Sequence, residues 1–115
     1  MSDVAGFLAA RLDEDEQYAK ASRPLQEAAM QMLGSDWPTG KLAGDRMLRE
    51  VEAKRARLAL LAEATAEMDK LLADKHAGIA DQAMAVGRVR GARMAVRYDA
   101  ALYSDHPDWN PDWRP

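Results

Sequence analysis

The stretch RMLREVEAKRARLALLAEATAEMDKLLADK, residues 46–75, contains neither glycine nor proline and predicts one helix about 45 Å long, with Asp45 as its N-cap. Apolar residues recur in it at alternating intervals of three and four, as in the seam of a helical hairpin or coiled coil: Leu48, Val51, Leu58, Ala62, Thr65 and Leu72. Arg55 and Asp69 occupy two further positions of this seam. We therefore expect the helix to pack along its length against other helices.

The residues after this helix predict its partner in the hairpin. His76-Ala77-Gly78 predicts a break, and a further helix is expected from Ile79 to Leu102. The two helices either fold back as an αα-hairpin, which we favour, or run on as one bent rod if Gly78 is tolerated within a helix. Small residues recur in it every four positions and would let another backbone approach closely: Ala83, Gly87, Gly91 and Ala95. Residues 103–115 are rich in proline and tryptophan and predict an extended tail, packed on the helical domain of residues 1–102.

The residues before the long helix predict two shorter helices. The first is expected from Asp3 to about Ala21, with Ser2 as its N-cap. Ser22-Arg23-Pro24 is expected to end it, because proline is favoured in the first turn of a new helix; that helix would be Pro24–Leu33. The cluster of Gly, Ser, Asp, Pro and Thr in Gly34–Gly44 predicts a loop.

The composition agrees with an all-α fold, a small helical bundle built on a long αα-hairpin. The 115 residues include 23 alanines but only eight β-branched residues, which argues against a sheet-dominated domain. The chain has no cysteine, so disulfide scaffolds and cysteine-ligated zinc sites are excluded. No apolar run is long enough to cross a membrane, and the N-terminus does not resemble a signal peptide. We expect a cytoplasmic protein.

An acidic run lies in the first predicted helix. Asp13-Glu14-Asp15-Glu16 points around the helix axis, so its four carboxylates cannot converge on one metal ion. The run is either a solvated acidic face or a docking patch for a basic partner. In the second case Asp13 and Glu16, which can share a face, would bind that partner.

The last predicted helix carries four arginines, Arg88, Arg90, Arg93 and Arg97, of which the last three fall on one side at i, i+3 and i+7. They either form ion pairs with the acidic first helix or meet the phosphates of a nucleic acid. The sequence pI of 5.3 argues against a dedicated nucleic-acid domain, which usually has a pI above about 9.

The tail contains Trp109 and Trp113, which either pack back onto the domain or are presented to a partner protein. Asp105, His106 and Asp108 could in principle ligate a metal, but a turn in which Asp105 caps the backbone is favoured. No nucleophile–base arrangement, phosphate-binding loop or dinucleotide fingerprint is present. We expect neither enzymatic activity nor a cofactor nor a metal.

Three stretches carry a resemblance to a known family: FLxxRLDEDE at residues 7–16, MLREVEAKR at residues 47–55 and YxDHPDWxPxWRP at residues 103–115. Together they resemble an uncharacterised family of small proteins from Streptomyces, related actinobacteria and their phages. The resemblance implies an actinobacterial or phage origin and a cytoplasmic location, and it transfers no catalytic residues. Members often have a Pro-Gly-Pro-Trp segment where this chain has Arg23-Pro24-Leu25-Gln26.

These observations favour a non-enzymatic interaction or regulatory protein. It would bind a protein partner through Asp13 and Glu16 or through Trp109 and Trp113. A homodimer is plausible, because apolar seams on long helices often continue across a two-fold axis. The alternative is a nucleic-acid-associated protein that uses the four arginines of the last helix.

Overall fold

The computed structural model describes residues 3–33 and 43–115. These residues form three α-helices, α1 (Val4–Leu33), α2 (Ala43–Ala73) and α3 (Ile79–Ala101), and a short 3-10 turn, η1 (Pro111–Trp113). The predicted all-α bundle is confirmed, and α2 and α3 form its αα-hairpin, turning at residues 74–78. None of the described helices is both long and apolar enough to cross a membrane.

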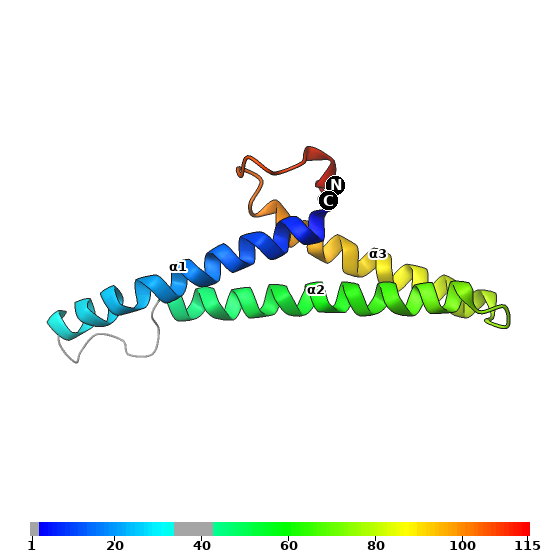
Figure 1. The fold of residues 1–115 in the computed structure, drawn as a ribbon, viewed down its shortest axis with the longest axis horizontal. Coiled ribbons are helices and arrows are strands. Elements are labelled where there is room, and N and C mark those ends of the chain that lie inside the picture. Colours follow the sequence, from blue (N-terminus) through cyan, green and yellow to red (C-terminus); the bar gives the residue numbers. More distant parts are fainter. Residues whose placement is uncertain (1–2, 34–42) are drawn as a thin grey trace.

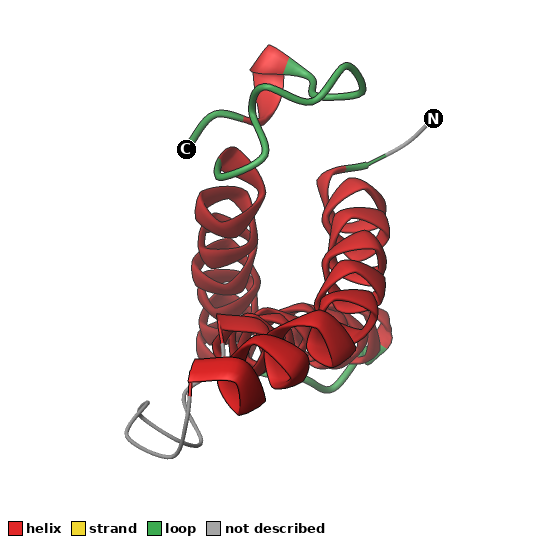
Figure 2. Cartoon of the chain, turned by 90° about the vertical axis from the view of Figure 1, so that its left-hand side faces the viewer, coloured by secondary structure: helices red, strands yellow, loops and turns green. Residues whose placement is uncertain are grey.

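The helices form a rod in which α2 is the central element (Figure 1). α1 runs antiparallel along the first half of α2, α3 runs back along its second half, and the two meet over the middle. Seen along the rod, α1 and α3 rise from two sides of α2, and the C-terminal tail lies above them (Figure 2). The molecule measures 66 × 29 × 18 Å. Three helices therefore pack together only near the middle, whereas each end of the rod is a two-helix pair.

α1 is a single helix, so the predicted break at Ser22-Arg23-Pro24 and the separate helix over Pro24–Leu33 are wrong. Pro24 removes one backbone hydrogen bond and costs about 3 kcal/mol in a helix interior. Contacts with the start of α2 on both sides of the proline offset this cost. Ala19 is 1 % exposed, and the Gly44 N–H donates to Gln26 Oε1 at 3.4 Å. A Cβ on Gly44 would lie 3.2 Å from the Ala19 carbonyl oxygen, so glycine permits this close approach.

Two predicted helix starts also differ from the structure. Asp3 caps α1, since its Oδ1 accepts a hydrogen bond from the Gly6 N–H at 2.7 Å; the predicted cap, Ser2, lies outside the described residues. α2 begins at Ala43, so Asp45 lies in its first turn and is not the N-cap. There a carboxylate still favours the helix, because it interacts with the positive end of the helix dipole. Most of the predicted loop, Gly34–Gly44, lies outside the described residues.

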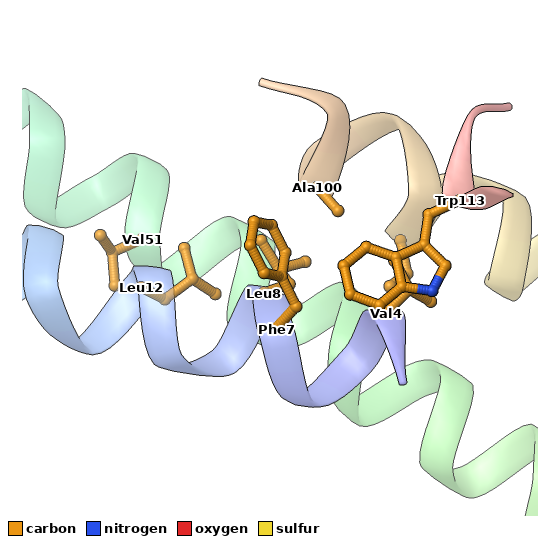
Figure 3. Close-up of a cluster of buried hydrophobic side chains, with 8 residues drawn as sticks. Val4, Phe7, Leu8, Leu12, Val51, Ala100 and Trp113 are labelled. Carbon is orange, nitrogen blue, oxygen red and sulfur yellow. The ribbon is translucent and has the colours of Figure 1, made fainter. Parts of the chain in front are cut away.

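The hydrophobic core lies where the three helices and the tail meet (Figure 3). Leu8 and Leu12 of α1 and Val96 and Ala100 of α3 are fully buried there. The remaining buried members of this cluster are Val4, Phe7, Val51 and Trp113. Every element of the fold thus contributes to one small core.

The position of this core predicts that its leucines carry much of the stability. Leu12→Ala should lower the free energy of unfolding by about 3 kcal/mol, because it removes a side chain that is 0 % exposed and leaves a cavity. Leu60→Ala is the control, since Leu60 lies on α2 but is 58 % exposed; it should change stability by less than about 0.5 kcal/mol. Urea denaturation followed by circular dichroism measures both. Equal losses in the two variants would contradict the packing described.

Candidate functional site

We call the row of positions from Leu48 to Leu72 the α2 seam, and its first half is covered by α1. Leu8 and Leu12 pack in one core with Val51, which is 3 % exposed, and Leu58 lies partly buried against the same cluster. The seam's arginine, Arg55, is matched by carboxylates of α1, with its Nη2 2.7 Å from Asp13 Oδ1 and 2.6 Å from Glu16 Oε2. A charged residue in the seam is therefore paired with opposite charges on the helix that covers it.

The acidic run of α1 is bonded throughout within the chain. Besides the two carboxylates at Arg55, Glu14 pairs with Arg11 at 3.0 Å and Asp15 accepts a hydrogen bond from the Tyr103 hydroxyl at 2.5 Å. Hydrogen bonds from Lys20 and then from Arg55 lower the pKa of Glu16 from 4.5 to about 2. Asp13 remains 68 % exposed at its side chain, so it is accessible from outside even while it is paired.

The tail packs on the helices, which is one of the two alternatives for its tryptophans. Trp113 is 8 % exposed, and its ring centroid lies 5.1 Å from that of Phe7. Trp109 is half-buried and makes edge contacts with both rings, at 5.7 Å to Phe7 and 5.6 Å to Trp113. The aromatic side chains of the tail thus complete the core and cover the N-terminal part of α1.

Polar contacts fasten the first part of the tail. The Tyr103 hydroxyl, besides donating to Asp15, accepts from Lys54 at 3.4 Å. Burial and then the bond to Asp15 raise the pKa of Tyr103. The guanidinium of Arg11 lies against the His106 imidazole, with Nη1 2.6 Å from Nδ1. The predicted cap by Asp105 is not among the hydrogen bonds of the described residues; the His106 ring instead accepts from the Asp108 N–H at 3.0 Å.

Beyond the N-terminus of α1 the fold leaves a groove, which we call the central groove. Its volume is about 760 Å³. Its floor is formed by α2, through Leu58, Leu61, Ala62, Thr65, Ala66 and Asp69. Its walls are formed by the other elements, through Asp3, Val4, Ala5, Arg93, Arg97, Asn110 and Trp113.

The floor of the central groove is the continuation of the α2 seam. Leu58, Ala62, Thr65 and Asp69 are successive seam positions, and they lie past the N-terminal end of α1, which rises away from α2 toward Val4 (Figure 1). In the described part of the chain no other helix takes this place, so the second half of the seam is open. The open half differs from the covered half in the size of its side chains, since its floor includes the small residues Ala62, Thr65 and Ala66.

Two arginines of α3 reach the groove. The Nε of Arg97 is buried and has no hydrogen-bond partner among the described residues. None of Arg88, Arg90, Arg93 and Arg97 has a carboxylate within 4.0 Å in the described part of the chain, whereas five arginines of α1 and α2 do: Arg11, Arg23, Arg46, Arg55 and Arg57. The expected ion pairs between the α3 arginines and the acidic first helix are therefore not formed, because Arg55 of α2 takes that role.

The four arginines do not form one surface. Arg90, Arg93 and Arg97 lie together on one side of α3 around Met94, as their spacing predicts. Arg88 lies on another side, in a shallow hollow that it shares with Glu63 and Glu67 of α2. Only Arg93 and Arg97 line the central groove. Three of the residues singled out in the sequence, Arg93, Arg97 and Trp113, therefore line the groove, but no sequence motif indicated its floor on α2.

The chain belongs to a family of unknown function, DUF6221, whose model matches residues 1–115. No curated protein and no solved structure shows a significant match to the chain. The all-α class and the family membership are thus established by the fold and by the sequence together, and the central groove is the feature from which a function can be argued.

The ion pairs of Glu16 predict a loss of stability in acid. Because its folded-state pKa is about 2 against an ordinary 4.5, its contribution is complete above the ordinary value and is lost as the pH falls toward 2. Glu16→Gln should unfold at a lower temperature than the unaltered protein at neutral pH, and the difference should shrink on acidification. Thermal melts across this pH range measure it. A difference independent of pH would show that Glu16 stabilises the fold by packing and not by charge.

Proposed function

We propose that this chain is a non-enzymatic interaction protein that binds a helix of a protein partner in the central groove. The open half of the α2 seam carries the proposal. A seam of this kind is typically covered by a helix, and residues 3–33 and 43–115 cover only its first half. Exposed apolar grooves of this size are typical of sites that take an amphipathic helix.

The covered half indicates what such a helix must supply. α1 fills the seam with Leu8 and Leu12, one helical turn apart, and offers carboxylates to Arg55. By the same logic, a helix in the central groove would place large apolar side chains over the small residues Ala62 and Ala66.

The partner-binding residues expected from the sequence have different roles in this proposal. Trp113 lines the central groove, so the tail takes part in partner binding as a wall of the site. Trp109 supports that wall from behind by its contact with Trp113. Asp13 and Glu16 form a second, exposed surface for a basic partner, although they must share their charges with Arg55.

The setting of the protein follows from the sequence. The resemblance to small proteins of actinobacteria and their phages supports a bacterial or phage origin, and the absence of cysteine suits the reducing cytoplasm. A homodimer belongs to the same proposal, since a second copy can supply the helix that each seam lacks.

Photo-crosslinking tests the groove directly. A photo-reactive residue at position 62, on the groove floor, should crosslink to protein in cells of the source organism. The same residue at position 56 should not, because Ala56 is exposed on the same helix but does not line the groove. Gel electrophoresis and mass spectrometry identify the products. Absence of a crosslink from position 62, or equal crosslinking from both positions, would contradict a helix-binding groove.

A second candidate function, binding to nucleic acid, is supported by the unpaired arginines of α3. Arg90, Arg93 and Arg97 would neutralise about three phosphates, so the affinity for a short DNA duplex should fall with salt at a logarithmic slope of about −3. Fluorescence anisotropy at several salt concentrations measures this slope. No binding at low salt, or an affinity that does not change with salt, would remove this candidate.

A further inference from the structure

The second half of α1 carries an apolar surface that the other described residues leave exposed. Tyr18, Leu25 and Met32 recur every seven residues and are 66 %, 76 % and 89 % exposed. The positions between them on the same side of the helix are Ala21, Ser22, Ala28 and Ala29, none of them charged. We call these seven residues the outer stripe of α1. It has the i, i+3, i+4, i+7 pattern of a helix face that packs against other helices.

We propose that the outer stripe of a second copy of this chain fills the central groove. This inference rests on the proposed function, because it names the helix that the groove takes. The stripe spans 15 residues, from Tyr18 to Met32, and the seam from Leu58 to Leu72 spans the same number, about 21 Å of helix in each case. The large side chains of the stripe would lie over the small residues of the groove floor, Ala62, Thr65 and Ala66.

The exposed area of the single chain supports a second copy. Its accessible surface is 8197 Å², whereas a compact monomer of 12.7 kDa exposes about 6,200 Å². The excess of about 2,000 Å² is enough for the interface of a permanent homodimer, which takes about 1,000 Å² or more from each subunit. Its radius of gyration, 19.2 Å against about 13 Å for a compact domain of this length, shows that the excess comes from the rod shape.

The placement of the two surfaces favours a symmetric dimer. The outer stripe lies on the half of the rod where α1 pairs with the start of α2, and the central groove opens onto the other half, toward the α2–α3 hairpin (Figure 1). With a second copy turned end for end, the stripe of each chain would contact the groove of the other. At each end of the dimer, helices of the second copy would then pack against the two-helix pair of the first and bury part of its exposed surface.

Light scattering of the purified protein tests this inference. We expect a mass of two chains, twice 12.7 kDa. Ala62→Glu in the groove and Leu25→Glu in the stripe should each raise the dissociation constant at least about tenfold, because each places a charge in the interface. The matched control is Ala56→Glu, which adds the same charge to an exposed alanine of α2 outside the groove and should leave the mass unchanged. All three sites are exposed in the single chain, so circular dichroism should show the same helix content in each variant.

Mixing the two weakened variants tests which surfaces meet. In a mixed dimer, the intact stripe of Ala62→Glu faces the intact groove of Leu25→Glu, so one of the two contacts is restored and the mixture should dimerise better than either variant alone. If the mixture dimerises no better than the separate variants, the contact between stripe and groove is overturned. The same holds if either Ala62→Glu or Leu25→Glu stays dimeric by itself. A monomeric unaltered protein would overturn the second copy altogether. If the unaltered protein is monomeric but position 62 crosslinks to another protein, the proposed function stands without the second copy. If the protein is monomeric and position 62 crosslinks to nothing, both proposals fail.

Discussion

Most of this structure depends on one constraint: the α2 seam is longer than the part of α1 that covers it. The α2 seam runs along a helix of 31 residues, but α1, whose N-terminal end is at Val4, covers only its first half. α3 returns along the second half on another side of α2, so it does not close the gap. The three-helix core is therefore confined to the middle of the rod, and the tail packs onto that core, where Phe7 offers an aromatic surface for Trp109 and Trp113.

The distribution of charge follows the same division. Arg55 forms ion pairs with carboxylates of α1. Arg57 forms an ion pair with Asp99 of α3, in which the arginine Nε lies 2.5 Å from the aspartate Oδ2. Both arginines lie on the central helix, where they meet the neighbouring helices in the packed region. The arginines of α3 that lie at the groove have no such partner in the described part of the chain. Among the described residues, the open half of the rod thus combines apolar surface with unpaired positive charge, and the proposed binding function rests on this combination.

The fold was largely predictable from the sequence, because helix propensity and seam spacing act locally. The break at Gly78 correctly predicted the hairpin, whereas the seam positions Ala62, Asp69 and Leu72 are exposed and do not form its interface. Pro24 gave a wrong prediction, since its local preference for a helix start is overridden by contacts between α1 and α2 at Ala19 and Gly44. The groove could not be predicted, because it depends on where α1 ends relative to α2. One signal was present: the seam continues past Leu58, for longer than the first helix expected from the sequence could cover.

Labelling of single cysteines along the α2 seam would test this account most directly, since the natural chain has none. In dilute protein, a cysteine at Val51 should react slowly with a thiol reagent and one at Thr65 rapidly, because α1 covers only the first position. As the protein concentration rises, the thiol at position 65 should become protected as a second copy covers it. Equally slow labelling at both positions in dilute protein would show that the seam is covered along its whole length within one chain, and would contradict the account.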